Sequence, residues 1–582
     1  FDDALKQALI VQLRQSPYLS IVSDDRVRET LGFMGRSPDE AMTEPVAREI
    51  CQRLNVKAML SGSIASLGSQ YVIALTAINC ENGDRLATEQ IQAARKEEVL
   101  ETLGRAATTL RGKLGESLAS VRQYDVAVAQ ATTPSLEALK AYTRGRRLIQ
   151  SGQSEVALTH YERAVSLDPE FALAHVGISA AQTNLRDLPG TKAAAAKAYA
   201  LRDRVTERER FSIDSQYFHA GLGDLDEAVR VYRRWAEVYP RDFTPRNNLG
   251  VVTGLLGRHE EALAHYQEAQ RIAPGVPIIL GNIANTLFIL GRPAEAKQVA
   301  TEVLAITSTQ RQPRATLIRV ACQEGDLSAA ARHADEARQK HEELPLHAMY
   351  LCMASRGRLG AARKLEAELQ AQSGLPSSHR VEHLGLFILT EWWLGDRARA
   401  RSLVRQAANV VPDGHLPFFF PSALATTAEH ARAREVLNAL ASEWPRATQL
   451  HSFEAPLAKA VLALNEQRPA QALEALREAV PVGAFEAEVS FYRGLAHMQT
   501  GAHREAVTAF REALQRQPYR QALWLGAGVP PVVQVHLAQA LAASGDGTGA
   551  REVLKRFLAY STGADADAPL LLEARRQLAR LQ

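Results

Sequence analysis

The stretch GRHEEALAHYQEAQRIAP, residues 257–274, decides the fold of this chain. It opens with a glycine, places the small Ala262 and Ala269 on either side of the larger Tyr266, and ends at Pro274. Positions i, i+4 and i+7 share one face of a helix, and small residues there admit a neighbouring helix. A glycine before a helix supplies a turn, and a proline after it ends the helix. The stretch therefore predicts one helix of a tightly packed pair.

The same pattern recurs along most of the chain. A glycine is followed five residues later by alanine and then, twelve residues further on, by proline in Gly152/Ala157/Pro169, Gly223/Ala228/Pro240, Gly257/Ala262/Pro274, Gly395/Ala400/Pro412 and Gly501/Ala506/Pro518. Gly223, Gly257, Gly291 and Gly325 follow one another at intervals of 34 residues. This interval is the period of the tetratricopeptide repeat (TPR), a helix pair that stacks on its neighbours. Four glycines in one register make coincidence a poor explanation.

Glycine also occurs on the first helix of several predicted pairs. Gly250 follows Asn248-Leu249, and Gly494 lies between Arg493 and Leu495. A glycine at this place lets the second helix of the pair approach closely. We therefore expect the aromatic residues Tyr266 and Phe510 of the second helices to pack there.

Extending the register predicts about twelve helix-turn-helix units between residues 138 and 560, several of them degenerate. Insertions are expected at residues 202–210 and 519–531, and the first contains the capping-box pattern TERE at residues 206–209. A last helix at residues 569–581, within a terminal segment 561–582, is expected to cap the stack. The predicted fold class is mainly α, a TPR α-solenoid preceded by a small α/β domain.

Residues 1–125 lack the repeat and predict that α/β domain, with residues 126–137 as a linker to the array. Helices are expected at residues 3–15, 24–35, 46–54 and 96–120, and a short strand at residues 19–22. Three further strands are expected at residues 56–64, 71–78 and 84–92. Turns containing Gly68 and Asn82-Gly83 join these three strands, which indicates an antiparallel meander.

The N-terminal residues also resemble a known family. The order of elements, with REICQRLNV at residues 48–56 and LSGSI at residues 60–64, resembles the TolB amino-terminal-like domain and the related FlgO type. Residues 73–83, which end in an Asn-Gly turn, resemble the closing hairpin of that family. The family normally begins with a strand carrying Phe-x-Asn before the first helix. The resemblance therefore implies that one strand of the sheet precedes this chain.

The combination of this domain with TPR units resembles the extracytoplasmic half of membrane-anchored bacterial serine/threonine kinases of the acidobacterial type. Some cyclases and CadC-like regulators are similar. The resemblance implies an extracytoplasmic, periplasmic location, with a cytoplasmic one as the alternative. It also implies a transmembrane helix and a kinase or other output domain upstream of Phe1, because the chain begins without methionine and carries no kinase signature.

The composition and motifs exclude several classes of function. Basic and acidic residues nearly balance, 68 against 65, so we expect no nucleic-acid partner. No apolar run reaches the roughly 18 residues of a membrane span, so we expect no direct membrane insertion. No P-loop, Gly-x-Ser-x-Gly or His-Glu-x-x-His motif occurs, so we predict no catalytic residue, cofactor or metal site and no enzymatic activity.

The four cysteines, Cys51, Cys80, Cys322 and Cys352, are too few and too scattered to predict a disulfide framework or a metal site. We expect them to be small buried hydrophobic residues. They leave the redox compartment open.

Two runs of aromatic residues are expected to pack within the array. Phe418-Phe419-Phe420 lies between Pro417 and Pro421 and is expected to fill a gap between repeats, with a partner surface as the alternative. Trp392-Trp393 is expected to lie in the core on at least one side.

Polar residues on the first helices of three consecutive units predict a partner-binding groove. They are Asn247, Asn248, Asn282, Asn285 and Arg319. First helices line the concave face of such an array. An asparagine amide pairs with both the donor and the acceptor of an extended backbone, and arginine binds a carboxylate through two hydrogen bonds. An alternative of equal weight is that asparagine is common at these repeat positions whatever the ligand.

We therefore predict a non-catalytic scaffold or sensor region of a bacterial signalling protein that binds a protein or peptide in the TPR groove. One alternative is a stand-alone assembly adaptor of the cell envelope. Another, ligand binding by the α/β domain, has no Gly-rich loop to support it. Enzymatic activity would come only from an upstream kinase domain. Self-association into a homo-oligomer is left open.

Overall fold

The computed structural model divides the chain into two compact units. The first comprises Phe1–Gly221 and Arg230–Pro245, and the second comprises Leu222–Val229 and Arg246–Gln582. The structure describes residues 2–22, 24–37, 40, 42–67, 70–95, 98–125, 133–150, 153–185, 187–307, 311–371, 377–410, 418–479, 486–515 and 529–581. The boundaries predicted at residues 125, 137 and 560 stay predictions. Gly68, Gly152, Pro412, Pro518, residues 126–132 of the linker and residues 519–528 of the second insertion lie outside the described residues.

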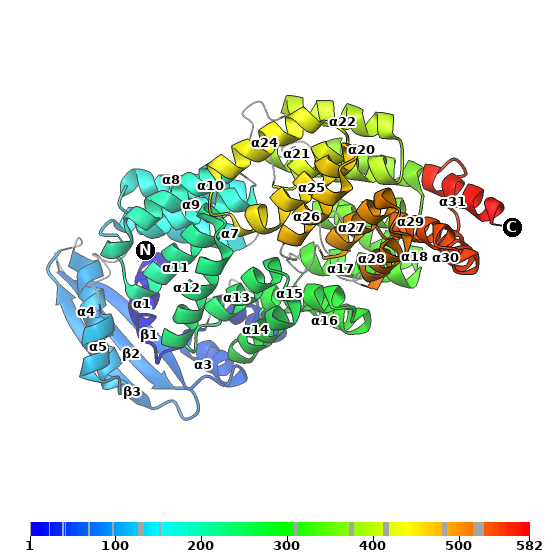
Figure 1. Ribbon diagram of the computed structural model, residues 1–582. Coiled ribbons are helices and arrows are strands. Elements are labelled where there is room, and N and C mark those ends of the chain that lie inside the picture. The colour runs from blue at the N-terminus through cyan, green and yellow to red at the C-terminus, as the bar shows by residue number, and fades with distance from the viewer. Residues whose placement is uncertain are drawn as a thin grey trace. The chain divides into compact units, whose positions relative to one another are not determined.

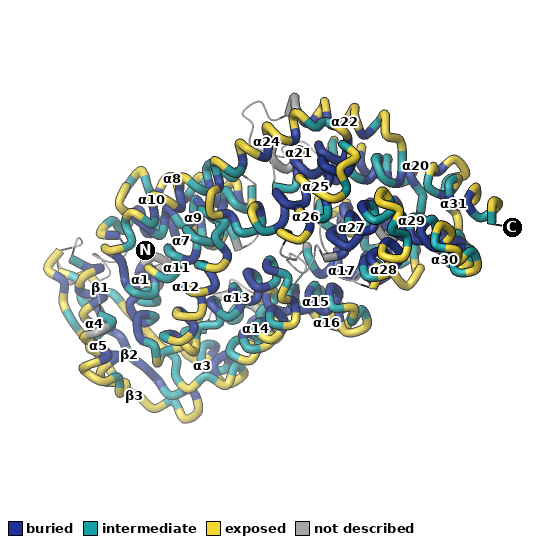
Figure 2. The backbone as a smooth tube through the Cα atoms, in the orientation of Figure 1, coloured by how far each residue is buried: buried dark blue, intermediate teal, exposed yellow. Residues whose placement is uncertain are grey.

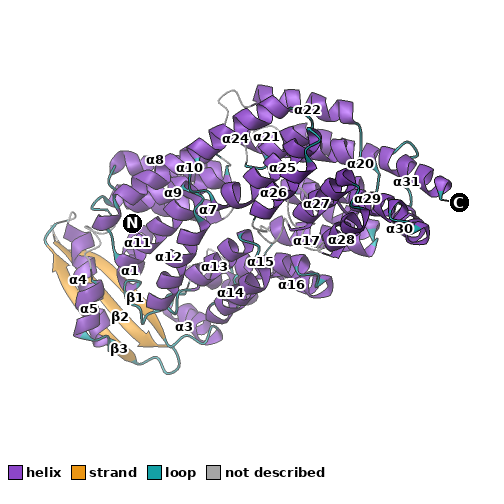
Figure 3. Ribbon diagram, in the orientation of Figure 1, coloured by secondary structure: helices purple, strands orange, loops and turns teal. Residues whose placement is uncertain are grey.

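The first unit contains a three-stranded antiparallel sheet in the order β1-β2-β3, as the turn signals predict. The strands are β1 (Ala58–Leu67), β2 (Gln70–Asn79) and β3 (Arg85–Ala93). Ile64, Ile73 and Ile91 lie side by side on one face of the sheet. Helix α4 (Val99–Lys113) packs against β2 and β3 on that face, and α1 (Asp2–Leu13) packs against α4 (Figure 3).

Two predictions for this region are wrong. Residues 19–22 form no strand, because Leu19 and Ile21 reach the core by side-chain packing without pairing to the sheet. The single helix expected at residues 96–120 is two helices, α4 and α5 (Leu118–Tyr124). The break follows from Gly115, whose φ of +97° lies in the left-handed region, and from Ser117, whose hydroxyl caps α5. The expected helices α2 (Asp24–Phe33) and α3 (Glu44–Arg53) are present.

A buried arginine joins the helices of this region. Arg111 is fully buried and forms ion pairs with Glu116 at 2.7 Å and Asp125 at 3.2 Å. Asp125 also accepts hydrogen bonds from the Gln12 amide at 2.6 Å and the Thr108 hydroxyl at 2.7 Å. Burial pushes the pKa of Glu116 upward, but hydrogen bonds, chiefly from Arg111, leave it below its usual range. The network therefore holds α1, α4 and α5 together through satisfied buried charges.

The rest of the chain is helical, as the repeat predicts (Figure 1). Among the described residues, twelve successive helix pairs occur, which matches the expected number of units. They are α7 (Leu136–Gln150) with α8 (Ser154–Leu167), α9 (Ala172–Asn184) with α10 (Leu188–Ala200), α11 (Glu207–Gln216) with α12 (Leu225–Val238), α13 (Phe243–Leu255) with α14 (His259–Ile272), α15 (Pro277–Ile289) with α16 (Pro293–Ile306), α17 (Arg311–Glu324) with α18 (Leu327–Gln339), α19 (Glu343–Ser355) with α20 (Leu359–Ala371), α21 (Ser377–Trp393) with α22 (Arg397–Val410), α23 (Phe420–Thr426) with α24 (His430–Glu443), α25 (Ala455–Asn465) with α26 (Pro469–Glu478), α27 (Glu486–Thr500) with α28 (His503–Gln515), and α29 (Val529–Ala543) with α30 (Gly547–Tyr560).

Shorter elements complete the array. A 3₁₀ turn, η2 (Arg202–Arg204), precedes α11, and the π-helical turns η3 (Tyr217–Gly221) and η4 (Leu450–Glu454) follow α11 and precede α25. The predicted capping box is present, with Thr206 and Glu209 bonding to each other's backbone. The expected terminal helix is α31 (Pro569–Arg580), which packs against α29 and α30.

The glycines of the 34-residue register are turn residues, as predicted. Gly223, Gly257, Gly291 and Gly325 have φ values of +67°, +75°, +72° and +82°. The turn survives where a unit has lost its glycine, since Ala428, five residues before Ala433, has φ +66°. The helix-pair geometry, supported by stacking on both sides, therefore imposes the left-handed conformation on that alanine.

Glycines on first helices accept an aromatic ring of a second helix, as predicted. A Cβ atom added to Gly250 would lie 2.5 Å from the Tyr266 ring, and one added to Gly494 would meet the Phe510 ring. Tyr161 lies against two such glycines, Gly145 of its own unit and Gly177 of the next. Tyr161, Tyr266 and Phe510 are all buried. One ring thus fills the space between helices that the missing side chain leaves open.

Two contacts within the second unit join residues that are more than 200 positions apart. Thr448 donates its N–H to the Gly223 carbonyl at 2.9 Å and accepts from the Leu225 N–H at 3.0 Å. Asp565 repeats this arrangement, because it donates to the Gly357 carbonyl at 3.0 Å and accepts from the Gly360 N–H at 2.7 Å. In each case the turn of one helix pair bonds to a loop several units further along the chain.

The expected role of the aromatic runs agrees with the structure. Phe418 contacts Trp444 with ring centroids 5.5 Å apart, Phe419 packs against Gly385, and Phe420 is buried. Trp393 is half-buried and contacts Phe491. The phenylalanine run therefore fills space between helix pairs, as predicted.

The cysteines form two disulfides, which corrects the prediction that they are isolated hydrophobic residues. Cys51 of α3 is bonded to Cys80, which directly follows β2, and Cys322 of α17 is bonded to Cys352 of α19. Both pairs have Cα atoms 5.9 Å apart. Sequence spacing did not reveal them, because each pair is brought together by packing between elements about 30 residues apart.

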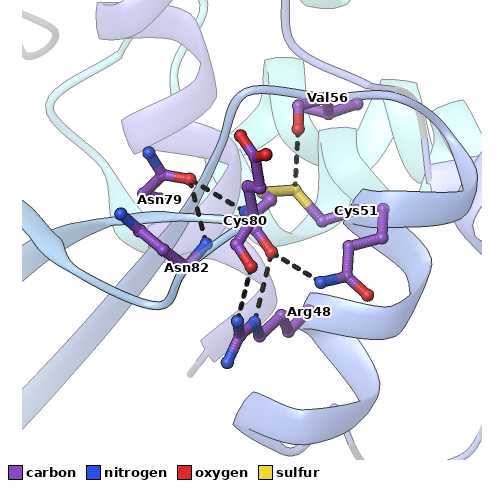
Figure 4. The surroundings of a disulfide bond; sticks show 8 residues. Arg48, Cys51, Val56, Asn79, Cys80 and Asn82 are labelled. Carbon is purple, nitrogen blue, oxygen red and sulfur yellow. Dashed lines mark hydrogen bonds between the residues drawn. A yellow bond between two sulfur atoms is a disulfide. The ribbon is translucent and has the colours of Figure 1, made fainter.

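The first disulfide lies in a hydrogen-bonded junction between α3 and the hairpin (Figure 4). Arg48 donates to the carbonyls of Cys80 at 3.1 Å and Glu81 at 2.6 Å. Gln52 donates to the Cys80 carbonyl at 2.9 Å. Backbone acceptors after β2 are therefore satisfied by side chains from the helix that the disulfide joins.

We predict that exchanging Gly250 for alanine destabilises the array by about 1–3 kcal/mol, because the new methyl group would overlap the Tyr266 ring. Gly254→Ala on the same helix is the matched control, since its Cβ would meet only the Ala262 methyl group at 3.8 Å. That change should leave stability unchanged or raise it by about 0.5–1 kcal/mol. Thermal unfolding followed by circular dichroism measures both, and equal effects of the two variants would contradict the packing.

We also predict that the oxidised protein reacts with no thiol reagent when denatured, and that prior reduction exposes four reactive cysteines. Mass spectrometry of the alkylated protein, with and without reduction, counts them. Reagent uptake before reduction would contradict the pairing.

The double variant Cys322→Ser/Cys352→Ser should lose about 2–4 kcal/mol of stability, because the loop between these positions is then unconstrained when unfolded.

Candidate functional site

First helices of several neighbouring units contact one another in the second unit. Helix α15 contacts α17, α17 contacts α19, and α23 contacts both α21 and α25. Second helices have no comparably extensive contacts with one another in the described part of the chain. First helices therefore lie on the more crowded inner side, which is the concave face of a TPR array. Figure 2 shows the contrast, since α25 is mostly dark blue and α22 alternates dark blue with yellow.

Three of the five predicted groove residues form one hydrogen-bonded chain. The Asn247 amide on α13 donates to the Asn248 side-chain carbonyl at 3.1 Å. The Asn282 amide, 35 positions further on α15, donates to the Asn247 side-chain carbonyl at 3.1 Å. Asn247 is buried, and Asn248 and Asn282 are half-buried. Side-chain amides of consecutive first helices therefore bond directly across the boundary between two units.

The other two predicted residues form a second group one unit further along. Arg319 on α17 donates to the Asn285 side-chain carbonyl on α15 at 2.9 Å and to the Thr316 hydroxyl at 3.1 Å. Its guanidinium lies 5.3 Å from the centre of the Phe288 ring. Burial lowers the pKa of Arg319 to about 10. Arg319 is thus largely enclosed, and its guanidinium joins α17 to α15 through the bond to Asn285.

These contacts define what the groups can do chemically. A side-chain amide has two donor hydrogens and an oxygen with two lone pairs, so one or two bonds use only part of its capacity. The half-buried Asn282 and Asn285 are therefore able to bond to a further polar group. The structure therefore brings the five residues together in two hydrogen-bonded groups. One joins the units of α13 and α15, and the other joins the units of α15 and α17. Whether they bind a partner stays a prediction.

A second polar site lies further along the array, and the sequence interpretation missed it. A small hollow with a free volume of about 30 Å³, room for one or two water molecules, is formed by first helices α21, α23, α25 and α27, and we call it the α21–α27 pocket. Its lining residues are Leu386, Leu389, Thr390, Trp393, Ser422, Thr426, Leu457, Glu488, Phe491 and Tyr492. Four consecutive units therefore contribute to one concave site.

One buried glutamate lines this pocket, and a second accepts a hydrogen bond from one of the lining residues. Glu488 lines it directly and is 5% exposed. Glu454, which is 4% exposed, ends the π-helical turn η4 and accepts a hydrogen bond of 3.4 Å from Ser422, another lining residue. Burial raises the pKa of Glu454 to about 8. Glu454 and Glu488 are 34 residues apart, which is one repeat period, so they occupy corresponding places in neighbouring units. This spacing is the sequence signal that could have revealed the two glutamates.

Other features of the described residues do not point to chemistry. No group of three or more His, Cys, Asp or Glu side chains suited to a metal ion occurs among them. No helix within the same residues is long and apolar enough to cross a membrane. Gly545–Gly549 is the start of α30, where the Asp546 carboxylate caps the Gly549 N–H at 2.8 Å.

We predict that Glu454→Gln removes a pH dependence of stability. Between pH 4.5 and about 8 the folded protein keeps a proton on Glu454 that the unfolded chain releases, so stability falls as pH rises through this window. The variant should gain on the parent by on the order of 1 kcal/mol per pH unit across it. Thermal unfolding of both proteins at pH 5, 6.5 and 8 measures the difference. Exposed Glu302→Gln is the control, and parallel profiles for Glu454→Gln and the parent would contradict the assignment.

Comparison with protein families finds the tetratricopeptide repeat in three segments of the chain. One family profile matches residues 242–309, and a second matches residues 142–204 and 457–520. The first segment contains four of the predicted groove residues, Asn247, Asn248, Asn282 and Asn285. No curated protein matches the chain.

Solved structures resemble separate parts of the chain. A thermophilic TPR protein of Thermus thermophilus is 22% identical over 34% of this chain and 97% of its own, with a TM-score of 0.27. The Pseudomonas aeruginosa pilF protein is 18% identical over 35% of this chain and 91% of its own, with a TM-score of 0.26. YrrB, described as a TPR protein with an unusual peptide-binding site, is 20% identical over 30% and 89%, with a TM-score of 0.20. The family matches and the twelve helix pairs establish that the chain carries tetratricopeptide repeats.

Proposed function

We propose that this chain is a scaffold that binds an extended protein or peptide segment along the inner face of its first helices. The observation that carries the proposal is the asparagine chain Asn248–Asn247–Asn282, which spans two units on that face. Side-chain amides carry both the donors and the acceptors that can pair with an extended backbone. Its members are already held by one another, so little conformational entropy is lost when a partner binds.

We further propose that the scaffold is the sensor region of a membrane-anchored bacterial signalling protein and works outside the cytoplasm. The resemblance of residues 48–64 and 73–83 to the TolB amino-terminal-like family supports this role. The two disulfides support the location, because disulfides persist in oxidising compartments and are rare in the cytosol. An assembly adaptor of the cell envelope is the second candidate, and the same disulfides favour it.

Fractionation of cells that express the full-length gene product tests the location. An anti-peptide antibody should find the product in membranes, and protease added to spheroplasts should degrade the TPR region while cytoplasmic markers survive. Release of the intact product with the periplasmic fraction would favour the adaptor. Protection from the protease until the membrane is lysed would overturn the extracytoplasmic proposal.

We predict that the double variant Asn248→Ala/Asn282→Ala loses at least tenfold in affinity for a captured partner, because it removes two polar contacts of the groove. The partner is isolated on immobilised parent protein, identified, and measured as a purified ligand by calorimetry. Glu302→Ala, an exposed change on the second helix α16, is the matched control.

Circular dichroism and thermal unfolding keep the prediction testable if the double variant weakens the array. A variant that folds like the parent and binds the partner equally well would remove the asparagine chain from the site. Loss of binding by Glu302→Ala alone would place the partner on the outer face instead.

A further inference from the structure

We propose that the exposed side of α22 binds an acidic segment of a partner protein. This side carries Arg397, Arg401 and Arg405, all exposed, and we call it the α22 arginine face. The three residues follow one another at intervals of four, so they share one side of the helix and lie about 6 Å apart along its axis. The inference goes beyond the proposed function, because α22 is a second helix and does not belong to the inner face of first helices.

Helix α22 carries positive charge that the protein itself does not balance. Its 14 residues include four arginines and no aspartate or glutamate. Arg399 forms ion pairs with Glu366 at 2.6 Å and Glu391 at 3.1 Å. Within the described residues, no carboxylate forms an ion pair with the α22 arginine face. The nearby Asp396 carboxylate instead accepts a hydrogen bond from the Ala398 N–H at 2.7 Å.

Other second helices neutralise exposed arginines with their own carboxylates. The helices α16, α18 and α24 do so at 2.7, 2.5 and 2.8 Å in the pairs Arg292–Glu295, Arg338–Asp335 and Arg432–Glu435. Such pairs stabilise a helix, whereas like charges four positions apart destabilise it. Helix α22 therefore bears a repulsion that carboxylates of a partner would relieve.

A tryptophan ring holds two of these arginines in place. Trp392 of α21 is half-buried, and its ring centre lies 5.0 Å from the Arg397 guanidinium and 5.7 Å from the Arg401 guanidinium. An arginine stacked on an aromatic ring loses side-chain freedom, but its N–H groups can still bind a carboxylate through two hydrogen bonds. Less conformational entropy is therefore lost when an acidic partner binds.

The surroundings of the α22 arginine face favour a protein over a membrane or a nucleic acid. No large apolar side chain is exposed on the described part of α22, whereas a helix that lies on a membrane inserts such side chains. The chain has nearly balanced charge, 68 basic against 65 acidic residues, and three arginines neutralise few phosphates. Glutamates at every fourth position of a partner helix would recur at the same interval of about 6 Å.

The experiment compares two fluorescein-labelled, alanine-based peptides, one with glutamate at every fourth position and one with glutamine at the same positions. Fluorescence anisotropy at low salt measures their binding to the whole chain. We expect the glutamate peptide to bind with a Kd at least about fivefold lower than that of the glutamine peptide. The variant Arg397→Gln/Arg401→Gln/Arg405→Gln should abolish this preference, because it removes the three unbalanced charges.

The matched control removes the same net charge at other places. Arg53→Gln/Arg292→Gln/Arg576→Gln changes three exposed arginines that each pair with a glutamate of the same helix, and it should retain the preference. Circular dichroism verifies that both triple variants fold. If the α22 triple variant does not fold, the single variant Arg405→Gln takes its place, and it should weaken binding of the glutamate peptide by at least about twofold.

Equal binding of the two peptides by the parent, or the same loss of preference in both triple variants, would overturn the α22 arginine face. Binding to vesicles of phosphatidylcholine and phosphatidylglycerol that is lost in the α22 variant, without any preference between the peptides, would assign the face to a membrane and overturn the protein partner. The Asn248→Ala/Asn282→Ala variant should keep the peptide preference. Failure of this face and failure of the proposed scaffold function are therefore distinguishable.

Discussion

Several helix pairs depend on one recurring contact, an aromatic ring of a second helix resting on a glycine of a first helix. Tyr266 on Gly250 and Phe510 on Gly494 repeat it in separate units, and Tyr161 bridges two glycines of consecutive units. Because no side chain larger than hydrogen fits under the ring, the distance between the two helices is fixed. In these pairs the ring and the glycine thus set how closely the two helices pack.

Largely enclosed polar side chains on the inner face occur in two different arrangements. Asn247, Asn248 and Asn282 bond to one another across units, so the polar row is satisfied before any partner arrives. Glu488 lines an aromatic hollow, and Glu454, whose pKa is raised by burial, accepts a hydrogen bond from Ser422 of the same lining. The first arrangement stabilises the free protein as well as a complex. The second keeps the Glu454 carboxyl protonated up to a pH of about 8.

The repeat made the helix pairs and their turns predictable, because a 34-residue interval of glycines constrains local geometry directly. It placed Asn282 and Arg319 on first helices correctly, but their bonds to Asn247 and Asn285 depend on how neighbouring units stack. The α21–α27 pocket was missed for the same reason, since its residues come from four helices that a linear pattern treats separately. The single helix expected at residues 96–120 failed because the pattern of apolar residues hid the effect of Gly115.

The sequence by itself determined the period, the helix pairs, the three-stranded meander and the set of glycines that packing requires, because these follow from local periodicity and turn chemistry. Tertiary structure alone decided which cysteines pair and where Thr448 and Asp565 return to earlier turns. It also decided which polar side chains meet. Those contacts join residues between about 30 and more than 200 positions apart, and their geometry is set by the stacking of whole units, which no short stretch of sequence encodes.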